Sequence, residues 1–212
     1  MVKIIDGSRI DIKKAESLDE VRKVQEMEYN YWGPNAVYPK HHPHHAGKKF
    51  SEVWKGEHGL AFSRYENLWA IFPEGIDIGV SADTGDIRGY NAYILINTFD
   101  IHKGMPNYNM EISKFHKADG NCLYVVNHTA PGLSDEMMEF MKKYASERSM
   151  SIATPTWTEI KPNNETHPYL VGEKGSNFWQ KNGFVPIEDT RDSEWHPDGG
   201  PKAEMLVRIW SP

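Results

Sequence analysis

The stretch Cys122–Glu147, CLYVVNHTAPGLSDEMMEFMKKYASE, is typical of a β-strand, a tight turn and an α-helix. Leu123–Val126 is a short apolar run, long enough for a buried strand and too short for a helix. Asn127–Gly132 has the composition of a turn. After it, apolar side chains recur every three or four residues, the period of one helix face. These are Leu133, Met137, Phe140, Met141 and Tyr144.

The turn into this helix is a candidate site for a phosphate group. Backbone N–H groups in the first turn of a helix have no acceptor within the helix, and the helix dipole is positive at that end. The same pattern also suits an ordinary connection, so a second stretch is needed to decide. Lys174–Phe184, KGSNFWQKNGF, predicts a short helix that carries Phe178 and Trp179 and ends at Asn182-Gly183.

In their order and separation, these two stretches resemble the GNAT superfamily of acyl-CoA-dependent N-acyltransferases. In that family the fourth strand leads into a loop of the form Gln/Arg-Gly-x-Gly-x-Gly/Ala and then a long helix, and this loop aligns with Thr129–Ser134. A later Phe-Tyr-x-x-x-Gly-Phe motif aligns with Phe178–Phe184. The resemblance implies an α/β (α+β) fold, with a mixed, mostly antiparallel central sheet and flanking helices, in one domain spanning residues 1–212.

The sequence departs from the family pattern at positions that carry chemistry. Only Gly132 of the loop glycines is present, and Pro131 removes one backbone N–H. Asp135 adds a negative charge close to the expected phosphate. The tyrosine of the later motif, a frequent acid in the family, is Trp179, which has no titratable proton.

The resemblance implies that acetyl-CoA binds along the fourth strand and the loop that follows it. The strand backbone would pair with the pantetheine arm and polarise the thioester carbonyl, while the loop would hold the pyrophosphate. The residues assigned to the cofactor are Tyr124, Val125, Val126, Thr129, Ala130, Gly132, Leu133, Ser134, Phe178 and Trp179.

An amine that attacks a thioester must lose a proton, so the site needs a base. His128 is the first candidate, because it ends the fourth strand and an imidazole titrates in the useful range. Glu159, after the fifth strand, is the second, and Glu74, at the start of the central hairpin, is the third. Tyr169 is a candidate acid in place of the missing tyrosine. Each of these residues also suits a solvent-exposed turn.

Residues 33–66 form an elaborated arm in the region that covers the acceptor site in GNAT proteins. Tyr31, Trp32, Tyr38 and Trp54, together with Glu74, are candidate acceptor-binding residues, and the alternative is that the aromatic rings pack the core. His41, His42, His44 and His45 could bind zinc or nickel. No neighbouring cysteine or acidic residue completes a ligand set, so a solvated loop is favoured and no metal is assigned.

The composition limits the class of protein. The 212 residues include 24 basic and 30 acidic side chains, and a net charge of -6 argues against a general nucleic-acid binder. No run of about 18 apolar residues is present, so no membrane span is predicted. The N-terminus lacks an apolar signal core, and we expect a cytoplasmic protein. The single cysteine, Cys122, begins an apolar strand and is expected to be a buried structural thiol.

The remaining elements follow from periodicity, capping and turn signals. Ser17 and Glu20 form a capping box at the start of a helix that ends at Gly33-Pro34. A long polar connection is expected over residues 100–120. The other predicted elements are strands at Arg9–Ala15, Ile76–Ser81, Ile87–Thr98, Ser151–Thr158, Phe184–Glu188 and Ala203–Trp210, a helix at Ser51–Tyr65 and a polar loop at Asp189–Gly200.

Two functions of a GNAT-like protein remain open at this point, beside the weaker option of a metal-binding protein that uses His41, His42, His44 and His45. The first is an acyltransferase that moves an acetyl or other short acyl group from acyl-CoA to a primary amine of a small molecule or amino acid. The second is a GNAT-fold protein that binds CoA or another ligand without transfer, as a sensor or regulator, and the altered loop favours it. The aromatic residues near 31–62 favour the enzyme, which is the preferred hypothesis. The expected partner is a small-molecule amine acceptor, with no nucleic acid and no membrane, and the resemblance leaves a homodimer open.

Overall fold

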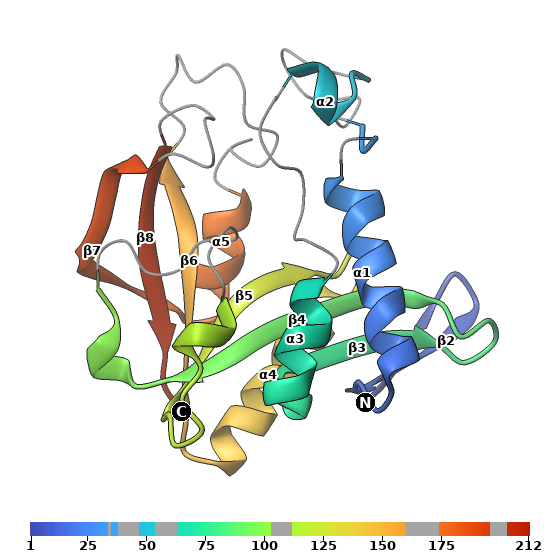
Figure 1. The fold of residues 1–212 in the computed structure, drawn as a ribbon, viewed down its shortest axis with the longest axis horizontal. Coiled ribbons are helices and arrows are strands. Elements are labelled where there is room, and N and C mark those ends of the chain that lie inside the picture. The colour runs from blue at the N-terminus through green and yellow to red at the C-terminus, as the bar shows by residue number, and fades with distance from the viewer. Residues whose placement is uncertain (34, 38–46, 54–62, 103–111, 160–173, 196–202) are drawn as a thin grey trace.

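Strands from both ends of the chain join in one twisted sheet in the computed structural model, which describes all residues except 34, 38–46, 54–62, 103–111, 160–173 and 196–202 (Figure 1). The strand order in this eight-stranded sheet is β1-β2-β3-β4-β5-β6-β8-β7. The strands are β1 (Val2–Ile5), β2 (Ser8–Lys14), β3 (Ile76–Ser81), β4 (Ile87–Ile96), β5 (Cys122–Thr129), β6 (Ser151–Glu159), β7 (Val185–Trp195) and β8 (Ala203–Trp210). The helices are α1 (Leu18–Trp32), α2 (Phe50–Val53), α3 (Ser63–Ile71), α4 (Ser134–Glu147) and α5 (Lys174–Lys181).

Neighbouring strands are antiparallel throughout, with the exception of β5 and β6, which are parallel and are connected through α4. Helices α1 and α3 pack on one face of the sheet, and α4 and α5 pack on the other (Figure 1). This arrangement confirms the predicted fold class of a mixed, mostly antiparallel sheet with flanking helices.

Strand β5 is covered on both faces, which explains its continuous apolar sequence. Cys122 and Tyr124 belong to the core beneath α1 and α3, whereas Leu123 and Val125 pack with methionines of α4. Burial raises the pKa of the Cys122 thiol to about 12, so the cysteine is a structural residue, as expected.

The ends of α1 confirm the capping signals in the sequence. The Ser17 hydroxyl accepts the Glu20 N–H at 3.2 Å, and the Glu20 carboxylate accepts the Glu16 N–H at 2.7 Å. At the other end, the Gly33 N–H donates to the Tyr29 carbonyl at 2.8 Å. These bonds satisfy backbone groups that the helix itself leaves without a partner.

Strands β5 and β6 pair over only three positions and then separate. The pairs are Cys122 with Ser151, Leu123 with Ile152 and Tyr124 with Ala153, although both strands continue for five residues or more. Pro155 follows shortly after the last pair and has no N–H to donate to a neighbouring strand. Beyond this point β6 stays paired with β8, so the β5 edge that faced β6 is left without a partner strand in the described part of the chain.

One strand was not predicted, and the bounds of three other elements were wrong. The first strand, β1, was missed, although Asp6-Gly7 supplies the positive φ values of a tight hairpin. The predicted helix at Ser51–Tyr65 is replaced by α2 and by α3, which continues to Ile71, with residues 54–62 outside the described part. Residues 127–129 continue β5 rather than forming a turn, because they pair with β4. Likewise, β7 extends to Trp195 through the predicted polar loop, because it pairs with β8.

The centre of the sheet should be far more sensitive to truncation than its edge. Ile94 in β4 is 0% exposed and Ile4 in β1 is 62% exposed. We expect Ile94→Ala to lower the free energy of unfolding by about 2–5 kcal/mol, because it leaves a cavity. The matched change Ile4→Ala should stay within about 0.5 kcal/mol. Urea unfolding followed by circular dichroism measures both, and equal losses would contradict the placement of Ile94 in the core.

Candidate active site

The outer half of β5, where it leaves β6, gathers most of the predicted site. The β4–β5 register shifts between Ala92 and Tyr93, so that Val126 is an extra residue in β5 and forms a β-bulge. The bulge and the separation from β6 lie next to one another on the strand. On this edge, backbone groups near Val125 and Val126 pair with no described strand.

His128 follows the bulge and lies on the α4 side of the sheet. Its Nδ1 is 2.6 Å from Oδ1 of Asn91, and its Nε2 is buried without a hydrogen-bond partner among the described residues. Desolvation lowers the pKa of His128 to about 4. The imidazole is therefore neutral at neutral pH, as a base must be before it accepts a proton.

The orientation of the Asn91 amide decides which nitrogen of His128 carries the proton. Asn91 Nδ2 donates to Asp77 Oδ2 at 3.2 Å and to the Met137 carbonyl at 3.2 Å. Because both of these partners only accept, the amide oxygen must be the atom that faces His128. The Nδ1 of His128 is then the donor, and the lone pair of the neutral ring lies on Nε2.

Two aromatic side chains of α5 enclose the imidazole. Phe178 stacks on His128 with ring centroids 5.2 Å apart and planes at 19°, and Trp179 meets it edge-on at 5.7 Å. Helix α5 also packs on β6, so these rings bridge the region where β5 and β6 separate. The structure thus brings together His128, Phe178 and Trp179, which the sequence assigned to the base and to the cofactor.

The loop from β5 into α4 offers backbone donors. Gly132 has a φ of +74°, and a Cβ added there would meet no atom within 4 Å, so its surface is open. The Leu133 N–H is used by the Ala130 carbonyl at 2.9 Å. In the part of the chain that the structure describes, no acceptor is found for the N–H groups of Ser134, Asp135 and Glu136, the first turn of α4. Three adjacent donors at a helix N-terminus suit a phosphate.

The acidic side chains at this turn are paired with lysines. Asp135 is 3.3 Å from Lys181 of α5, and Glu136 forms an ion pair with Lys3 of β1. Lys3 Nζ also lies 3.5 Å from the Gly132 carbonyl. The negative charge of Asp135 is therefore offset locally, although the pair is exposed and weak.

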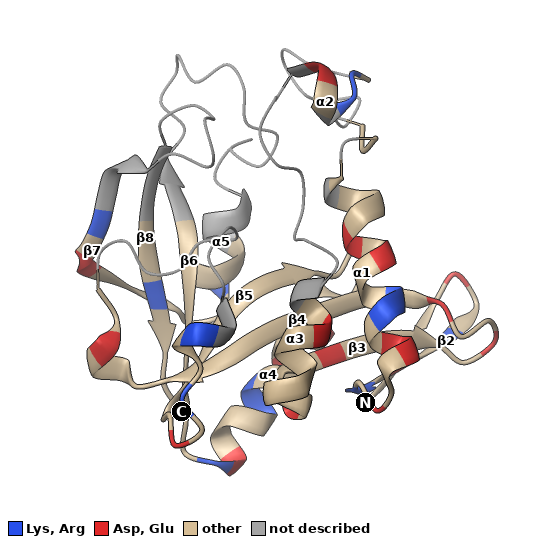
Figure 2. Ribbon diagram, in the orientation of Figure 1, with Lys and Arg blue, Asp and Glu red and all other residues tan. Residues whose placement is uncertain are grey.

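Strand β5 itself carries no charged side chain (Figure 2).

The side chains of Ala130 and Leu133 are buried, which limits their assigned role. Leu133 packs with Met137 and with isoleucines of β2. Thr129 is also buried, and its hydroxyl donates to Asn127 Oδ1 at 3.1 Å. A contribution of these three residues to cofactor binding would come from the backbone, and the assignment stays a prediction.

A second buried polar cluster lies on the opposite face of β5, beneath α1 and α3. The Glu28 carboxylate accepts from Asn127 Nδ2 at 2.9 Å and from the Tyr90 hydroxyl. The hydroxyl groups of Tyr65 and Tyr90 are 3.1 Å apart. Consecutive residues of β5, Asn127 and His128, therefore join separate polar clusters on the two faces of the sheet.

Sequence reasoning missed Glu28, Asp77 and Asn91. Glu28 follows Val21 and Val24 at helical spacing, so a charged residue occupies the apolar face of α1. Asp77 and Asn91 interrupt strands whose other residues are mostly apolar. A polar residue at a position predicted to be buried is the signal that could have identified all three.

Among the acceptor-binding candidates, Tyr31 is 44% exposed on α1. Trp32 and Glu159 lie at the ends of α1 and β6, and only their backbone is described. Tyr38, Trp54, Tyr169 and the histidines at 41, 42, 44 and 45 lie outside the described residues. The assignment of these residues stays a prediction.

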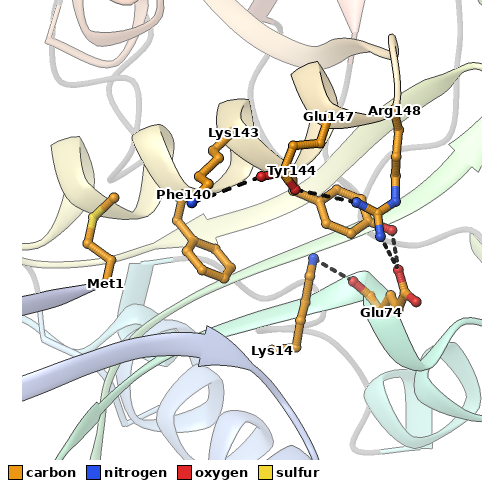
Figure 3. Close-up of a pocket in the computed structure, with 8 residues that line it drawn as sticks. All are labelled: Met1, Lys14, Glu74, Phe140, Lys143, Tyr144, Glu147 and Arg148. Atoms are coloured by element: carbon orange, nitrogen blue, oxygen red, sulfur yellow. Dashed lines mark hydrogen bonds and ion pairs between the residues drawn. The ribbon is translucent and has the colours of Figure 1, made fainter.

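Glu74 lies apart from the other candidates, in a cavity of about 630 Å³ beside the C-terminal end of α4 (Figure 3). Its carboxylate accepts from the Tyr144 hydroxyl and pairs with Arg148 at 3.5 Å. The loop at residues 129–134 lies at the other end of the same helix. The structure therefore does not bring Glu74 together with His128.

Two further features concern metals and membranes. No group of three or more histidine, cysteine, aspartate or glutamate side chains is close enough to hold a metal ion within the described ranges. None of the described helices is long and apolar enough to cross a membrane.

Comparison with known proteins identifies the fold. No protein-family model matches the sequence, and no curated protein matches it. The loading GNATL domain of CurA from Lyngbya majuscula superposes with a TM-score of 0.63 at 12% identity, covering 95% of this chain and 97% of that domain. The GphF GNAT-like decarboxylase, solved in complex with isobutyryl-CoA, gives 0.61 at 11% identity, with 95% and 98% covered. The ribosomal-protein-S18-alanine N-acetyltransferase from Escherichia coli gives 0.55 at 7% identity, with 95% and 93% covered.

The chain therefore has the GNAT fold that its sequence resembles. The matched structures include an N-acetyltransferase, a loading domain and a decarboxylase, so the likeness establishes the architecture and leaves the reaction to be argued from the site.

The low pKa of His128 should make folding stability depend on pH. The unfolded imidazole titrates near 6.5 and the folded one near 4, so the unfolded state binds more protons between these values. Stability should therefore fall as the pH drops from about 6.5 to 4, by up to about 3 kcal/mol from this residue. Urea unfolding at pH 7 and pH 4.5 measures the loss.

His128→Gln should lose less stability over the same range than the wild-type protein. The control is His102→Gln, which removes an exposed imidazole and should keep the wild-type dependence. If His128→Gln and the wild type lose stability equally, the buried neutral imidazole is contradicted.

Proposed function

We propose that this protein is an acyltransferase that moves a short acyl group, such as acetyl, from acyl-CoA to a primary amine of a small molecule or amino acid. The observation that carries the proposal is a neutral imidazole, with a lone pair on Nε2, next to the bulged and unpaired edge of β5. Such an imidazole would act as a base beside backbone groups that could bind an extended pantetheine arm and polarise a carbonyl.

The cofactor would be held along β5 and the first turn of α4. The pantetheine amides would bond the open backbone near Val125 and Val126, replacing the strand that is missing from this edge. The pyrophosphate would lie on the N–H groups of residues 134–136, next to the open surface of Gly132. Phe178 and Trp179 would form an apolar wall around the thioester.

The reaction would be a direct attack by the amine on the thioester carbonyl. The new C–N bond forms, His128 Nε2 accepts the amine proton, and the C–S bond breaks to release the CoA thiolate. A base whose pKa is lowered by burial gives up its proton readily, so the same imidazolium can protonate the departing thiolate. This route needs no separate acid, which accounts for Trp179 in place of a tyrosine. Because Nε2 is buried, a local rearrangement of the residues around it would be needed for the amine to reach it.

The alternative is a protein with this fold that binds CoA or another ligand without transfer. Pro131, which removes a backbone N–H, and Asp135, whose ion pair with Lys181 is exposed and weak, favour it, because they weaken the phosphate site. The two functions share cofactor binding and differ in whether loss of His128 has a chemical consequence.

Acetyl-CoA and CoA should each bind in the micromolar range, about -8 kcal/mol. Isothermal titration of the purified protein measures both. We expect Gly132→Leu to abolish binding, because a side chain there would cover the donors of α4. The matched control is Gly7→Leu, since Gly7 has a φ of +81° and equally open surroundings in the β1–β2 turn. Absence of binding at millimolar ligand would refute the proposed function.

His128→Ala should leave the Kd for acetyl-CoA within about threefold and lower kcat/KM by about 10²- to 10⁴-fold. The assay is a screen of primary amines with acetyl-CoA, in which the release of the free CoA thiol is measured. Tight binding without turnover on any amine, in the wild-type protein as well, would favour the binding function. Equal turnover by the wild type and His128→Ala would show that His128 does not act as the base.

A further inference from the structure

Four polar residues form a row across four adjacent strands on the α4 side of the sheet. In the strand register, Lys14 of β2 lies opposite Asp77 of β3, Asp77 opposite Asn91 of β4, and Asn91 opposite His128 of β5. Residues opposite one another in a sheet project from the same face, so the four side chains meet in sequence. Helix α4 covers the row, and its Met137 carbonyl bonds Asn91.

Hydrogen bonds connect the row from end to end. Lys14 Nζ is 2.7 Å from Asp77 Oδ1, Asn91 Nδ2 is 3.2 Å from Asp77 Oδ2, and His128 Nδ1 is 2.6 Å from Asn91 Oδ1. The Tyr93 hydroxyl also donates to Asp77, at 3.0 Å. Asp77 and Asn91 are completely buried, and each of their polar side-chain atoms has a partner.

Such a row is costly to keep inside a protein core. Burial raises the pKa of the Asp77 carboxyl, against the opposing effect of the Lys14 ammonium, and lowers the pKa of Lys14. Apolar residues of similar volume often give equal or greater stability than a buried ion pair. A role beyond stability would account for a charged and amide-bearing row at the centre of the sheet.

We propose that Lys14, Asp77 and Asn91 are positioning residues that fix the proton of His128 on Nδ1 and keep its Nε2 lone pair free. Asp77 holds the Asn91 amide with its nitrogen toward β3, and Lys14 keeps Asp77 in its acceptor form. Asn91 then presents only an acceptor to the imidazole. The functional part of this inference rests on the proposed role of His128 as the base, whereas the proton position does not.

The first residue of the row, Lys14, is in contact with solvent. Lys14 points into the cavity beside α4, where its ammonium lies 3.7 Å from the ring centroid of Tyr144 and donates to the Glu74 carbonyl at 2.8 Å (Figure 3). Its side chain is 21% exposed, whereas that of Asp77 is 0% exposed. The charge that stabilises the row is thus supplied from an accessible site.

The test is nitrogen-15 NMR of the histidine side chains in the full chain at pH 7. In the wild-type protein the His128 signals should show a protonated Nδ1 and an unprotonated Nε2. Asn91→Leu removes the acceptor with little change in volume, and should shift the ring toward the form protonated on Nε2. Asp77→Asn allows the Asn91 amide group to rotate by about half a turn, so that its nitrogen can face His128. This variant should shift the proton of His128 in the same direction.

Tyr93→Phe is the matched control, because it removes the hydroxyl that bonds both Asp77 and Lys14 and leaves the contacts of Asn91 unchanged. It should leave the His128 signals unchanged. In the acyl-transfer assay, Asn91→Leu should lower kcat by about 10- to 100-fold with an unchanged Kd for acetyl-CoA.

A wild-type His128 protonated on Nε2 would overturn the inference without any variant, and so would an unchanged proton position in a folded Asn91→Leu protein. If the proton lies on Nδ1 and moves in the variants but no amine is acylated, the positioning of His128 holds and the proposed function fails. If amines are acylated but the proton position on His128 is the same in the wild type and in Asn91→Leu, the proposed function holds and the positioning role of Asn91 is refuted.

Discussion

The short parallel pairing of β5 with β6 is the constraint on which the rest of the structure depends. Three residue pairs hold the two halves of the sheet together, and beyond Tyr124 and Ala153 the strands separate. Buried backbone N–H and C=O groups require partners, so an edge that opens in the middle of a sheet is costly unless water or a ligand completes it. The bulge at Val126, the proline in β6 and the rings of α5 all lie at this opening.

The sheet also separates two polar environments with a single strand between them. On one face Asn127 joins a carboxylate and two tyrosines, and on the other His128 joins an amide and a carboxylate. Extended backbone sends consecutive side chains to opposite faces. One change in the path of β5 would therefore disturb both clusters together, which ties the chemistry of the site to the geometry of the strand.

The fold was predictable from sequence because it depends on local patterns. The apolar run at Leu123–Val126, the helical period of α4 and the capping residue Ser17 each indicate one element, and their order indicates the superfamily architecture. The partners of His128 were not predictable in this way. Asn91 and Asp77 are 37 and 51 positions away in the chain, and only the register of two strand pairs, β3–β4 and β4–β5, brings them into line.

Several predicted residues stay undecided for a related reason. Burial of Thr129, Ala130 and Leu133 shows that a sequence motif marks the path of the backbone and does not reveal which atoms face a ligand. The strand boundaries were misjudged at Asn127 and beyond Glu188, because polar residues in a paired strand look like loop residues in the sequence. In both cases the deciding contacts are made with distant strands.

The position of Cys122 has a consequence for how this molecule can be observed. The thiol is fully buried and lies in the first residue pair of the β5–β6 junction, opposite Ser151. A buried thiol with a pKa of about 12 is inert, since only the exposed thiolate reacts. The chain has no other cysteine, so an added thiol reagent can modify only Cys122. The rate of this modification depends on how often local opening exposes the centre of the sheet. The rate of thiol modification is thus a built-in probe of local opening around the first residue pair of the β5–β6 junction.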